Sequence, residues 1–252
     1  MSAVRNWAPA SYLEAVAASS HGVGYKELCA ALLELREGHV VVDLGCGPGV
    51  DLPRLARAVG TSGEVVGVDL DEGALAAARR AAPSARLIHA DVARVVGLSD
   101  GSVDRVKTDR VLQHVSDPSA VVAEVVRLLR RGGRVVFCEP DWDTLVLDID
   151  PAVSRRYRDF VTGTVIHNPV VGRGLPRLSR GAGLHVEAVS AYTSVMTKAS
   201  EVRGILGLSR VAERAVEAGA LTADEAAIVA GVEASDHCLA AVSLVLTVAT
   251  KP

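Results

Sequence analysis

The fold of this chain is decided by one stretch, VVVDLGCGPG at residues 40–49. Its first half is an apolar run that suits a strand buried in a parallel sheet, and its three glycines let the backbone approach a ligand where any Cβ would intrude. The spacing is G-x-G-x-G with an acid just ahead, whereas a dinucleotide-binding loop reads G-x-G-x-x-G and offers a free helix N-terminus to a pyrophosphate. The stretch therefore predicts a strand-to-helix turn that binds a nucleotide-type ligand bearing positive charge and hydroxyl groups.

The segment DLGCGPG, residues 43–49, resembles the first motif of class I S-adenosylmethionine-dependent methyltransferases, of the UbiE-like or secondary-metabolite type that acts on small molecules. In that family the glycine loop passes under the methionine part of the cofactor, and the acid lies close to its ammonium group. The resemblance thus implies that S-adenosyl-L-methionine is bound by four residues here: Asp43, Gly45, Gly47 and Gly49. A tight turn without a ligand is the alternative, which the acid and the matches downstream disfavour.

The composition excludes several classes of function. At 252 residues, the chain is long enough for one large α/β domain with a substantial core. A net charge of −3 without a basic block argues against nucleic acid as a partner, because phosphate neutralisation needs a concentrated basic patch. No apolar run approaches the roughly 20 residues of a membrane span, and no secretory signal pattern is present. The widely spaced cysteines are typical of reduced thiols, so a cytoplasmic location is expected.

Strand and helix patterns alternate from Val40 onward, as parallel strands joined by crossover helices require. The predicted strands are residues 40–44, 64–69, 86–89, 103–108, 134–138, 186–196 and 240–249. The predicted helices are residues 10–19, 25–36, 52–59, 72–82, 118–130, 151–165, 175–182 and 199–218, with a further one opening at Thr222. The helix over 118–130 has a capping acid before it and Gly132-Gly133 after it, and Thr222 begins a capping-box pattern.

The family resemblance covers residues 38–140 and implies a Rossmann-like α/β fold. It implies a seven-stranded, mostly parallel sheet with helices on both faces and the last strand inserted antiparallel, plus a helical lid and cap. We therefore expect a single domain over residues 1–252. Its parts are N-terminal lid helices over 1–37, a core over 38–196 and 237–252, and a helical cap insertion over 197–236.

Two further strand ends carry acids that suit a nucleoside. Asp69 ends the second strand, where an open parallel sheet presents ligand-binding residues, and a carboxylate there can accept both ribose hydroxyls. The resemblance assigns it that role and places Leu70 beside the adenine. Asp91 and Val92 follow the third strand, where the family reads the adenine amino group with an acid and a backbone amide. Each acid has a plainer alternative as a helix cap.

The segment TDRVLQHV, residues 108–115, follows the fourth strand and is similar to the segment that flanks the sulfonium and the acceptor in small-molecule methyltransferases. The resemblance makes Thr108, Arg110 and Gln113 cofactor-binding. His114 is the candidate catalytic base, because its pKa falls near neutrality. A base helps only when the acceptor carries a proton, so shaping of the cofactor pocket and core packing stay open as its other roles.

The acceptor is expected to lie against the loop after the fifth strand. Trp142 and Asp141 in EPDWD, residues 139–143, suggest a substrate wall, with a surface loop as the alternative. His167, Asn168 and Arg173 lie in a segment that would close over the acceptor. Two positions depart from the family pattern, Lys107 and the Arg131 that replaces a usual proline, and neither is expected to bear on the cofactor residues.

The resulting prediction is a methyltransferase that acts on a small organic acceptor, a natural-product or quinone-like intermediate, and that can form a homodimer. The histidines and cysteines have no zinc-ligand spacing, and a hydrolase nucleophile elbow is missing, so neither a metal nor hydrolysis is expected. The alternatives are an RNA or protein methyltransferase, a cyclase-like protein that binds the cofactor without methyl transfer, and a nicotinamide dehydrogenase.

Overall fold

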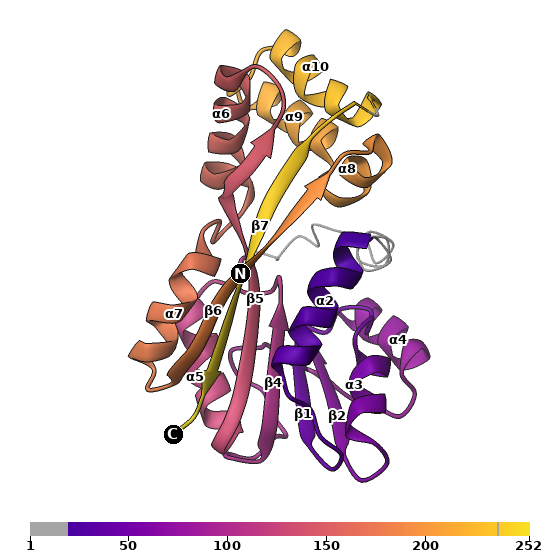
Figure 1. Cartoon of the computed structure of the whole chain (residues 1–252), viewed down its shortest axis with the longest axis vertical. Helices are drawn as coiled ribbons and strands as arrows, with labels where there is room; N and C mark the ends of the chain where they lie inside the picture. The colour runs from indigo at the N-terminus through magenta and orange to yellow at the C-terminus, as the bar shows by residue number, and fades with distance from the viewer. Residues whose placement is uncertain (1–19, 236) are drawn as a thin grey trace.

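A seven-stranded sheet runs through the computed structural model, which describes residues 20–235 and 237–252 (Figure 1). Its strands are β1 Val40–Leu44, β2 Glu64–Asp69, β3 Arg86–His89, β4 Val103–Asp109, β5 Leu129–Leu147, β6 His185–Met196 and β7 Ala240–Thr250. The order is β3-β2-β1-β4-β5-β7-β6, and β7 is antiparallel to both of its neighbours. The predicted Rossmann-like fold with an antiparallel last strand is confirmed.

Helices cover both faces of this sheet. On one face lie α2 Ser20–Leu32, α3 Leu52–Val59 and α4 Glu72–Ala81, and on the other lie α5 Pro118–Leu128 and α7 Val171–Gly181. Side chains alternate along β1 accordingly, so that Val41 packs in the core under α3 while Val42 packs in the core under α5. Asp43 therefore points to the α3 side.

The chain leaves β1 for β2 on one side and returns to β4 on the other, so the strand order reverses between β1 and β4. Loops diverge at such a point and leave a crevice at the carboxyl ends of the strands. The register places Asp43 beside Gly67 on one side and beside Lys107 on the other. The predicted ligand-binding residues therefore belong to the one edge where an open sheet accepts a ligand.

Three long strands, β5, β6 and β7, continue beyond this core into a second helical body (Figure 1). Around their ends gather α6 Pro151–Phe160, a π-helical turn Val161–Val165, α8 Ala199–Ile205, α9 Leu208–Glu217, α10 Ala223–Gly231 and a 3-10 turn Val232–Ala234. Buried side chains such as Tyr157, Met196 and Val229 form a separate apolar core there. The pairing of β5 with β7 is irregular between Asp141 and Val146, where the strand passes from one body to the other.

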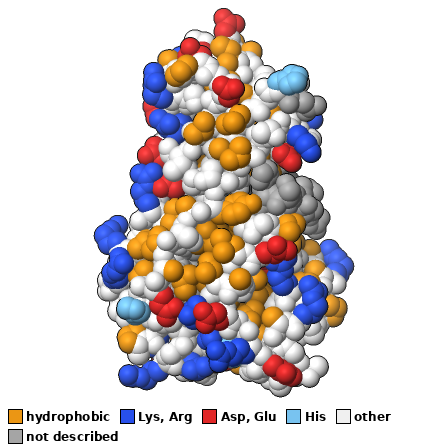
Figure 2. All heavy atoms as spheres, viewed as in Figure 1, with side chains coloured by type: hydrophobic (Ala, Val, Ile, Leu, Met, Phe, Trp, Pro, Cys, Tyr) orange, Lys and Arg blue, Asp and Glu red, His pale blue; other side chains and the backbone are white. Residues whose placement is uncertain are grey.

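Hydrophobic side chains lie on the surface where the long strands cross between the two bodies (Figure 2). Val189 and Val195 of the edge strand β6 are exposed. Within the described ranges, every helix is too short or too polar to cross a membrane.

The end of α5 differs from the prediction. The helix was expected to reach Arg130 and to stop at the glycine pair, but it ends at Leu128 and Leu129 already begins β5. Lys251 explains the change, because its Nζ donates to the carbonyls of Val126 and Leu129 at 2.7 and 2.8 Å. A cation from the last residues of the chain thus caps this helix.

The predicted helix over 199–218 is also wrong in detail, because it is two helices, α8 and α9. Gly207 separates them with φ +57°, a left-handed conformation that glycine adopts without strain. The carboxylate of Glu233 accepts hydrogen bonds from the backbone N–H groups of Leu208 and Ser209 and so caps α9. The predicted capping box at Thr222 is confirmed at the start of α10.

The first described helix, α2, was predicted over 25–36 and instead spans Ser20–Leu32. Two arginines of the sheet donate hydrogen bonds to backbone carbonyls at the end of this helix. Arg105 Nε donates to the carbonyl of Leu33 at 2.7 Å, and Arg134 Nη1 donates to the carbonyl of Leu32 at 3.0 Å. The chain then turns at Glu34, which has φ +49°. The predicted helix over 10–19 lies outside the described residues.

Replacing Gly49 by alanine should destabilise the fold. A Cβ at this position would lie 2.8 Å from the Cα of Ala78 in α4, and φ is +79°. Overpacking against backbone costs about 1–3 kcal/mol of unfolding free energy, which urea denaturation measures. Gly231→Ala is the matched control, because a Cβ there meets nothing within 4 Å. Equal stability of the two variants would contradict this account.

Candidate cofactor and acceptor site

The glycine loop, residues 45–49, joins β1 to α3 at the carboxyl edge of the sheet. Gly45, Gly47 and Gly49 have φ of +75°, +54° and +79°. A Cβ on Gly45 would lie 2.4 Å from Cγ2 of Val111 in the loop after β4. The loops after β1 and β4 therefore touch where the strand order reverses, and only glycine fits between them.

Asp69 ends β2 beside this loop. Its Oδ2 accepts a hydrogen bond from the N–H of Gly47 at 2.7 Å, and its Oδ1 accepts one from the N–H of Asp71 at 2.9 Å. A carboxylate has about four lone-pair sites, so acceptor capacity is left for hydroxyl groups of a ligand. The next residue, Leu70, is 57% exposed and leaves an apolar side chain uncovered at the rim.

Asp91 and Val92 follow β3 and have different surroundings. The Asp91 side chain is exposed, and its Oδ1 accepts a hydrogen bond from the N–H of Ala93 at 2.9 Å. The Val92 side chain is buried in the core under α5, so only its backbone can face a ligand. Asp43, Asp69 and Asp91 thus end three adjacent parallel strands.

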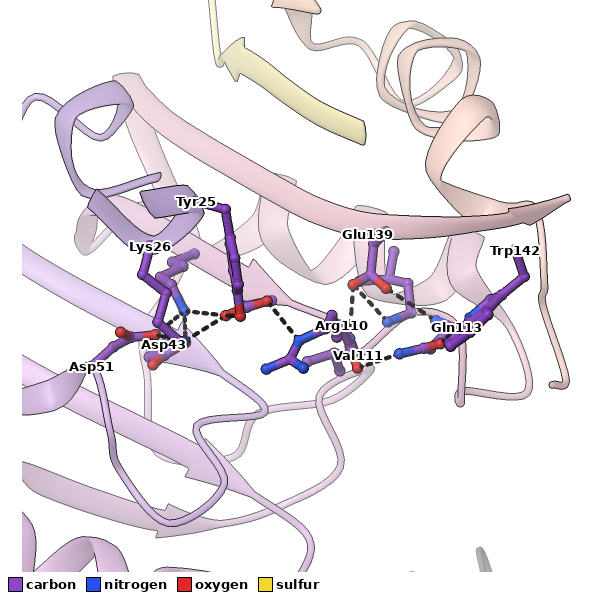
Figure 3. Close-up of polar contacts among 12 residues, drawn as sticks. Tyr25, Lys26, Asp43, Asp51, Arg110, Val111, Gln113, Glu139 and Trp142 are labelled. Atoms are coloured by element: carbon purple, nitrogen blue, oxygen red, sulfur yellow. Dashed lines mark hydrogen bonds and ion pairs between the residues drawn. The ribbon is translucent and has the colours of Figure 1, made fainter. Parts of the chain in front are cut away.

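Asp43 lies beneath the glycine loop, only 2% exposed, within a network of buried charges (Figure 3). Its strand neighbour Lys107 places Nζ 3.4 Å from Oδ1 of Asp43 and 2.8 Å from Oδ2 of Asp51. Lys26 of α2 donates to Asp51 and to Asp109, both at 2.7 Å. Lys107, noted above as a departure from the family pattern, thus contacts Asp43, one of the predicted cofactor residues.

Burial and charge act in opposite directions on these groups. Burial raises the pKa of Asp43 to about 6, against the lowering effect of Lys107. Burial alone would also raise the pKa of Asp109, but Lys26 and Arg110 outweigh it and hold that pKa well below its usual range. Burial favours neutral Lys107, yet the three carboxylates raise its pKa above the usual value and keep it charged. Asp43 is thus the acid of the network whose ionisation lies nearest to neutral pH.

The three predicted cofactor residues at the end of β4 and in the loop after it point in different directions. Thr108 is fully buried, and its hydroxyl has no hydrogen-bond partner among the described residues. Arg110 has φ +59°, and its guanidinium lies 5.6 Å from the ring centroid of Tyr25 with Nε 3.2 Å from Asp109. Gln113 is buried and turns toward Trp142 of β5, which the sequence had placed in a loop after that strand. The segment therefore links the α2 side of the site to the acceptor side.

Glu139 holds this segment from within the sheet (Figure 3). Its Oε1 accepts hydrogen bonds from the N–H groups of Val111 and Leu112 at 2.8 and 2.9 Å, and its Oε2 accepts one from Gln113 at 3.3 Å. Burial raises the pKa of Glu139 to about 8, and the three N–H donors oppose the shift. Glu139, an acid of the EPDWD segment that was predicted to form a substrate wall, thus fixes the backbone of the loop after β4.

Asn168 holds the same segment from the other side. Its Nδ2 donates to the carbonyls of Leu112 and Val115 at 2.9 and 2.7 Å, and its N–H donates to the carbonyl of Gln113 at 3.0 Å. Sequence reasoning placed Asn168 near the acceptor without a role. It fixes the backbone on either side of His114.

His114 is solvent-exposed, with its N–H bonded to the carbonyl of Val111 at 2.9 Å. Enough protein surrounds the ring that partial desolvation, together with the charge of Arg110, lowers the pKa of His114 to about 4. A neutral imidazole at pH 7 can accept a proton. The candidate base is therefore neutral at pH 7, and its lowered pKa makes it a weaker base than an ordinary histidine.

Trp142 connects the loop after β4 to the second helical body. Its Nε1 donates to Oε1 of Gln113 at 2.8 Å, and its N–H donates to the carbonyl of Pro169 at 2.9 Å. Its ring borders a small apolar cavity between β5, α6 and α9. The other residues that line the cavity are Leu145, Tyr157, Val161, Val165, Ile166, Leu206, Leu208 and Val211.

The remaining predicted acceptor residues are partly occupied with one another. Arg173 Nη2 donates to Oδ1 of the buried Asp141 at 2.7 Å, and Nε donates to its other oxygen. Arg173 also reaches Asp143 at 3.3 Å. The bidentate pair fastens α7 to β5, whereas the side chain of His167 is exposed.

Charge at every second position of β4 is the signal that could have revealed the buried network. Arg105, Lys107 and Asp109 share the face that α2 covers, although central parallel strands normally read as continuous apolar runs. Among the described residues, no group of three or more His, Cys, Asp or Glu side chains could hold a metal ion.

Comparison with known proteins finds relatives of the part of the chain that carries the glycine loop. Residues 42–137 match the family model described as a methyltransferase domain. A protein in transposon Tn4556 of Streptomyces fradiae, described as uncharacterized, is 44% identical over 216 residues, which are 84% of this chain and 63% of that protein. The demethylmenaquinone methyltransferase of Staphylococcus aureus is 34% identical over 114 residues, which are 44% of this chain and 47% of that enzyme. The chain thus spans less than two thirds of either relative.

Solved structures support the fold. A candidate methyltransferase from Bacillus halodurans superposes with a TM-score of 0.65 at 15% identity, covering 91% of this chain and 99% of that one. Residues 42–137 of this chain therefore match a methyltransferase domain, and the fold around them agrees with the match.

Proposed function

We propose that this chain transfers a methyl group from S-adenosylmethionine to a small organic acceptor of a natural-product or quinone-like type. The observation that carries the proposal is the set of three acids, Asp43, Asp69 and Asp91, at the ends of adjacent strands around the glycine loop. These residues fit the cofactor, because carboxylates suit an ammonium group, a pair of ribose hydroxyls and an adenine amino group. When bound, the cofactor supplies a methyl group that its positive sulfur activates.

The acceptor would lie between His114 and Trp142, on the other side of the loop after β4. That loop is clamped by Glu139 and Asn168, so its side chains are held in place before any ligand arrives. Orientation of the acceptor against the methyl group can supply much of the rate acceleration. The apolar residues that surround Trp142 favour an organic acceptor. One relative, from Staphylococcus aureus, carries the name demethylmenaquinone methyltransferase, which also supports an acceptor of this kind.

Mass spectrometry tests the proposal directly. The purified protein is mixed with methyl-labelled S-adenosylmethionine and a panel of quinones, phenols and isoprenoid compounds, with RNA and protein as further samples. A labelled small molecule is the expected product. Label on RNA or protein would favour the macromolecular alternative, and cofactor binding without any labelled product would favour a cyclase-like protein. A cytoplasmic location and a homodimer stay predictions from the sequence.

Asp69→Ala should weaken binding of S-adenosylmethionine by about tenfold or more, because each charge-assisted hydrogen bond contributes about 1.5–3 kcal/mol. Calorimetric titration measures the affinity. Asp71→Ala is the matched control: it removes the neighbouring acid, which caps α4 through the N–H groups of Gly73 and Ala74. The control should lose stability but keep its affinity. Unchanged affinity in Asp69→Ala would remove this carboxylate from the site.

His114→Ala should lower kcat by about 10²-fold or more while the cofactor Kd stays nearly constant, because a general base contributes about that much. Since the neutral imidazole is the active form, wild-type kcat should be flat near neutrality and fall only as the pH drops toward about 4. His185→Ala, an exposed histidine at the start of β6, is the control. Equal losses in kcat and cofactor affinity would instead assign His114 to shaping the cofactor pocket.

Trp142→Phe should raise the acceptor KM with little effect on cofactor binding, because it removes the hydrogen bond to Gln113 and reshapes the apolar wall. Initial-rate kinetics with the acceptor found by mass spectrometry measures KM. Tyr157→Phe is the control, since it alters a cavity residue without a bond to the loop after β4. A loss of thermal stability with an unchanged KM would make Trp142 purely structural.

A further inference from the structure

The network beneath the glycine loop brings five charged groups from four parts of the fold together. We name it the acid–lysine cluster: Lys26, Asp43, Asp51, Lys107 and Asp109. The five side chains are each at most 10% exposed. Buried charges are tolerated only when they are paired closely. The cluster is therefore costly to maintain, and a purely structural strand would be more stable with apolar residues here.

Its charges are distributed unevenly. Asp51 has Lys26 at 2.7 Å and Lys107 at 2.8 Å, and Asp109 has Lys26 at 2.7 Å and the Nε of Arg110 at 3.2 Å. Among the described residues, Asp43 pairs with Lys107 alone, at 3.4 Å. Asp43, one of the two acids that flank the glycine loop, is thus the least compensated, and a further cation on the loop side would complete the pairing.

We propose that Lys107 is a positioning residue for cofactor binding, whose ammonium group holds Asp43 as a fixed negative charge beneath the glycine loop for the ammonium group of S-adenosylmethionine. This inference rests on the proposed function. Direct contact is not required, because an unscreened charge in a buried site acts over several ångströms. Lys26 extends the same arrangement to α2, which covers the cluster.

Every element packed against Asp43 supplies a group that influences its ionisation. Lys107 and Asp109 come from β4, Asp51 stands before α3, Lys26 and Tyr25 come from α2, and Cys46 lies in the glycine loop. Burial raises the pKa of Asp43 to about 6, and Lys107 is the strongest opposing influence. The charged form exists above this pKa. Cofactor affinity should therefore be full at higher pH and fall as the pH drops through about 6.

The test measures binding of S-adenosylhomocysteine, which keeps the amino-acid end of the cofactor, by calorimetry between about pH 4.5 and 7.5. Lys107→Met leaves Asp43 without its cation, which raises the carboxyl pKa. The midpoint of the pH dependence should rise by about one unit or more, and affinity at pH 7 should therefore fall about twofold or more. Lys107→Arg should restore both values toward wild type. Wild-type affinity and midpoint in Lys107→Met would overturn the inference.

Arg105→Met is the matched control. Arg105 is a buried cation on the same face of the same strand, but it donates to the carbonyl of Leu33 instead of an acid. This variant should lose stability and keep the wild-type midpoint. A midpoint that shifts as much as in Lys107→Met would show a general effect of unpacking β4 and would contradict the inference.

Asp43→Asn with Lys107→Met removes both charges and so avoids a buried unpaired carboxylate if Lys107→Met alone does not fold. The double variant should bind as weakly as Asp43→Asn alone, because Lys107 acts through Asp43. A further loss of similar size to that in the wild-type background would show that Lys107 acts independently. Wild-type protein that binds neither S-adenosylmethionine nor S-adenosylhomocysteine at any pH would instead overturn the proposed function together with the inference.

Discussion

A carboxylate buried beneath a glycine loop needs a nearby cation, and the pairing of β1 with β4 supplies it. Because the two strands are parallel and in register, Asp43 and Lys107 lie side by side under α2. The same ammonium group reaches Asp51 at the start of α3, and Lys26 then brings α2 into the network. One strand register thus places a helix, a loop and an acid around a single edge of the sheet.

Much of the fold could be predicted because its signals are local. The apolar run at residues 40–44, the alternation of strands and helices, and the capping box at Thr222 each act within a few residues. Helix ends were harder, because distant side chains set them. Lys251 ends α5, and Glu233 begins α9, although neither is near its helix in the sequence. Contacts of this kind leave no mark in a local pattern.

The residues of the candidate site also fall into those that a local sequence pattern predicts and those whose role depends on distant parts of the chain. The glycine loop and Asp69 were predicted from spacing, and the structure places them within hydrogen-bond distance of each other. The roles of Glu139 and Asn168 depend on which loop faces them, and that is a property of strand order. Lys107 was noticed only as a departure from the family pattern. Its meaning required the neighbouring strand, because a buried lysine is explained by its partners and not by its position in the sequence.

The three long strands have a mechanical consequence. The pairing of β6 with β7 runs without a break from Ala188 to Met196, so backbone hydrogen bonds join the second helical body to the core, whereas the pairing of β5 with β7 is interrupted between Asp141 and Val146. A movement of the helices of the second body would therefore twist β5, because, in the described part of the chain, no flexible hinge separates the two. Glu139 lies on β5 and accepts hydrogen bonds from the backbone of the loop before His114. A twist of β5 would therefore displace the backbone of that loop. Strand β5 therefore connects the second helical body to the backbone of this loop.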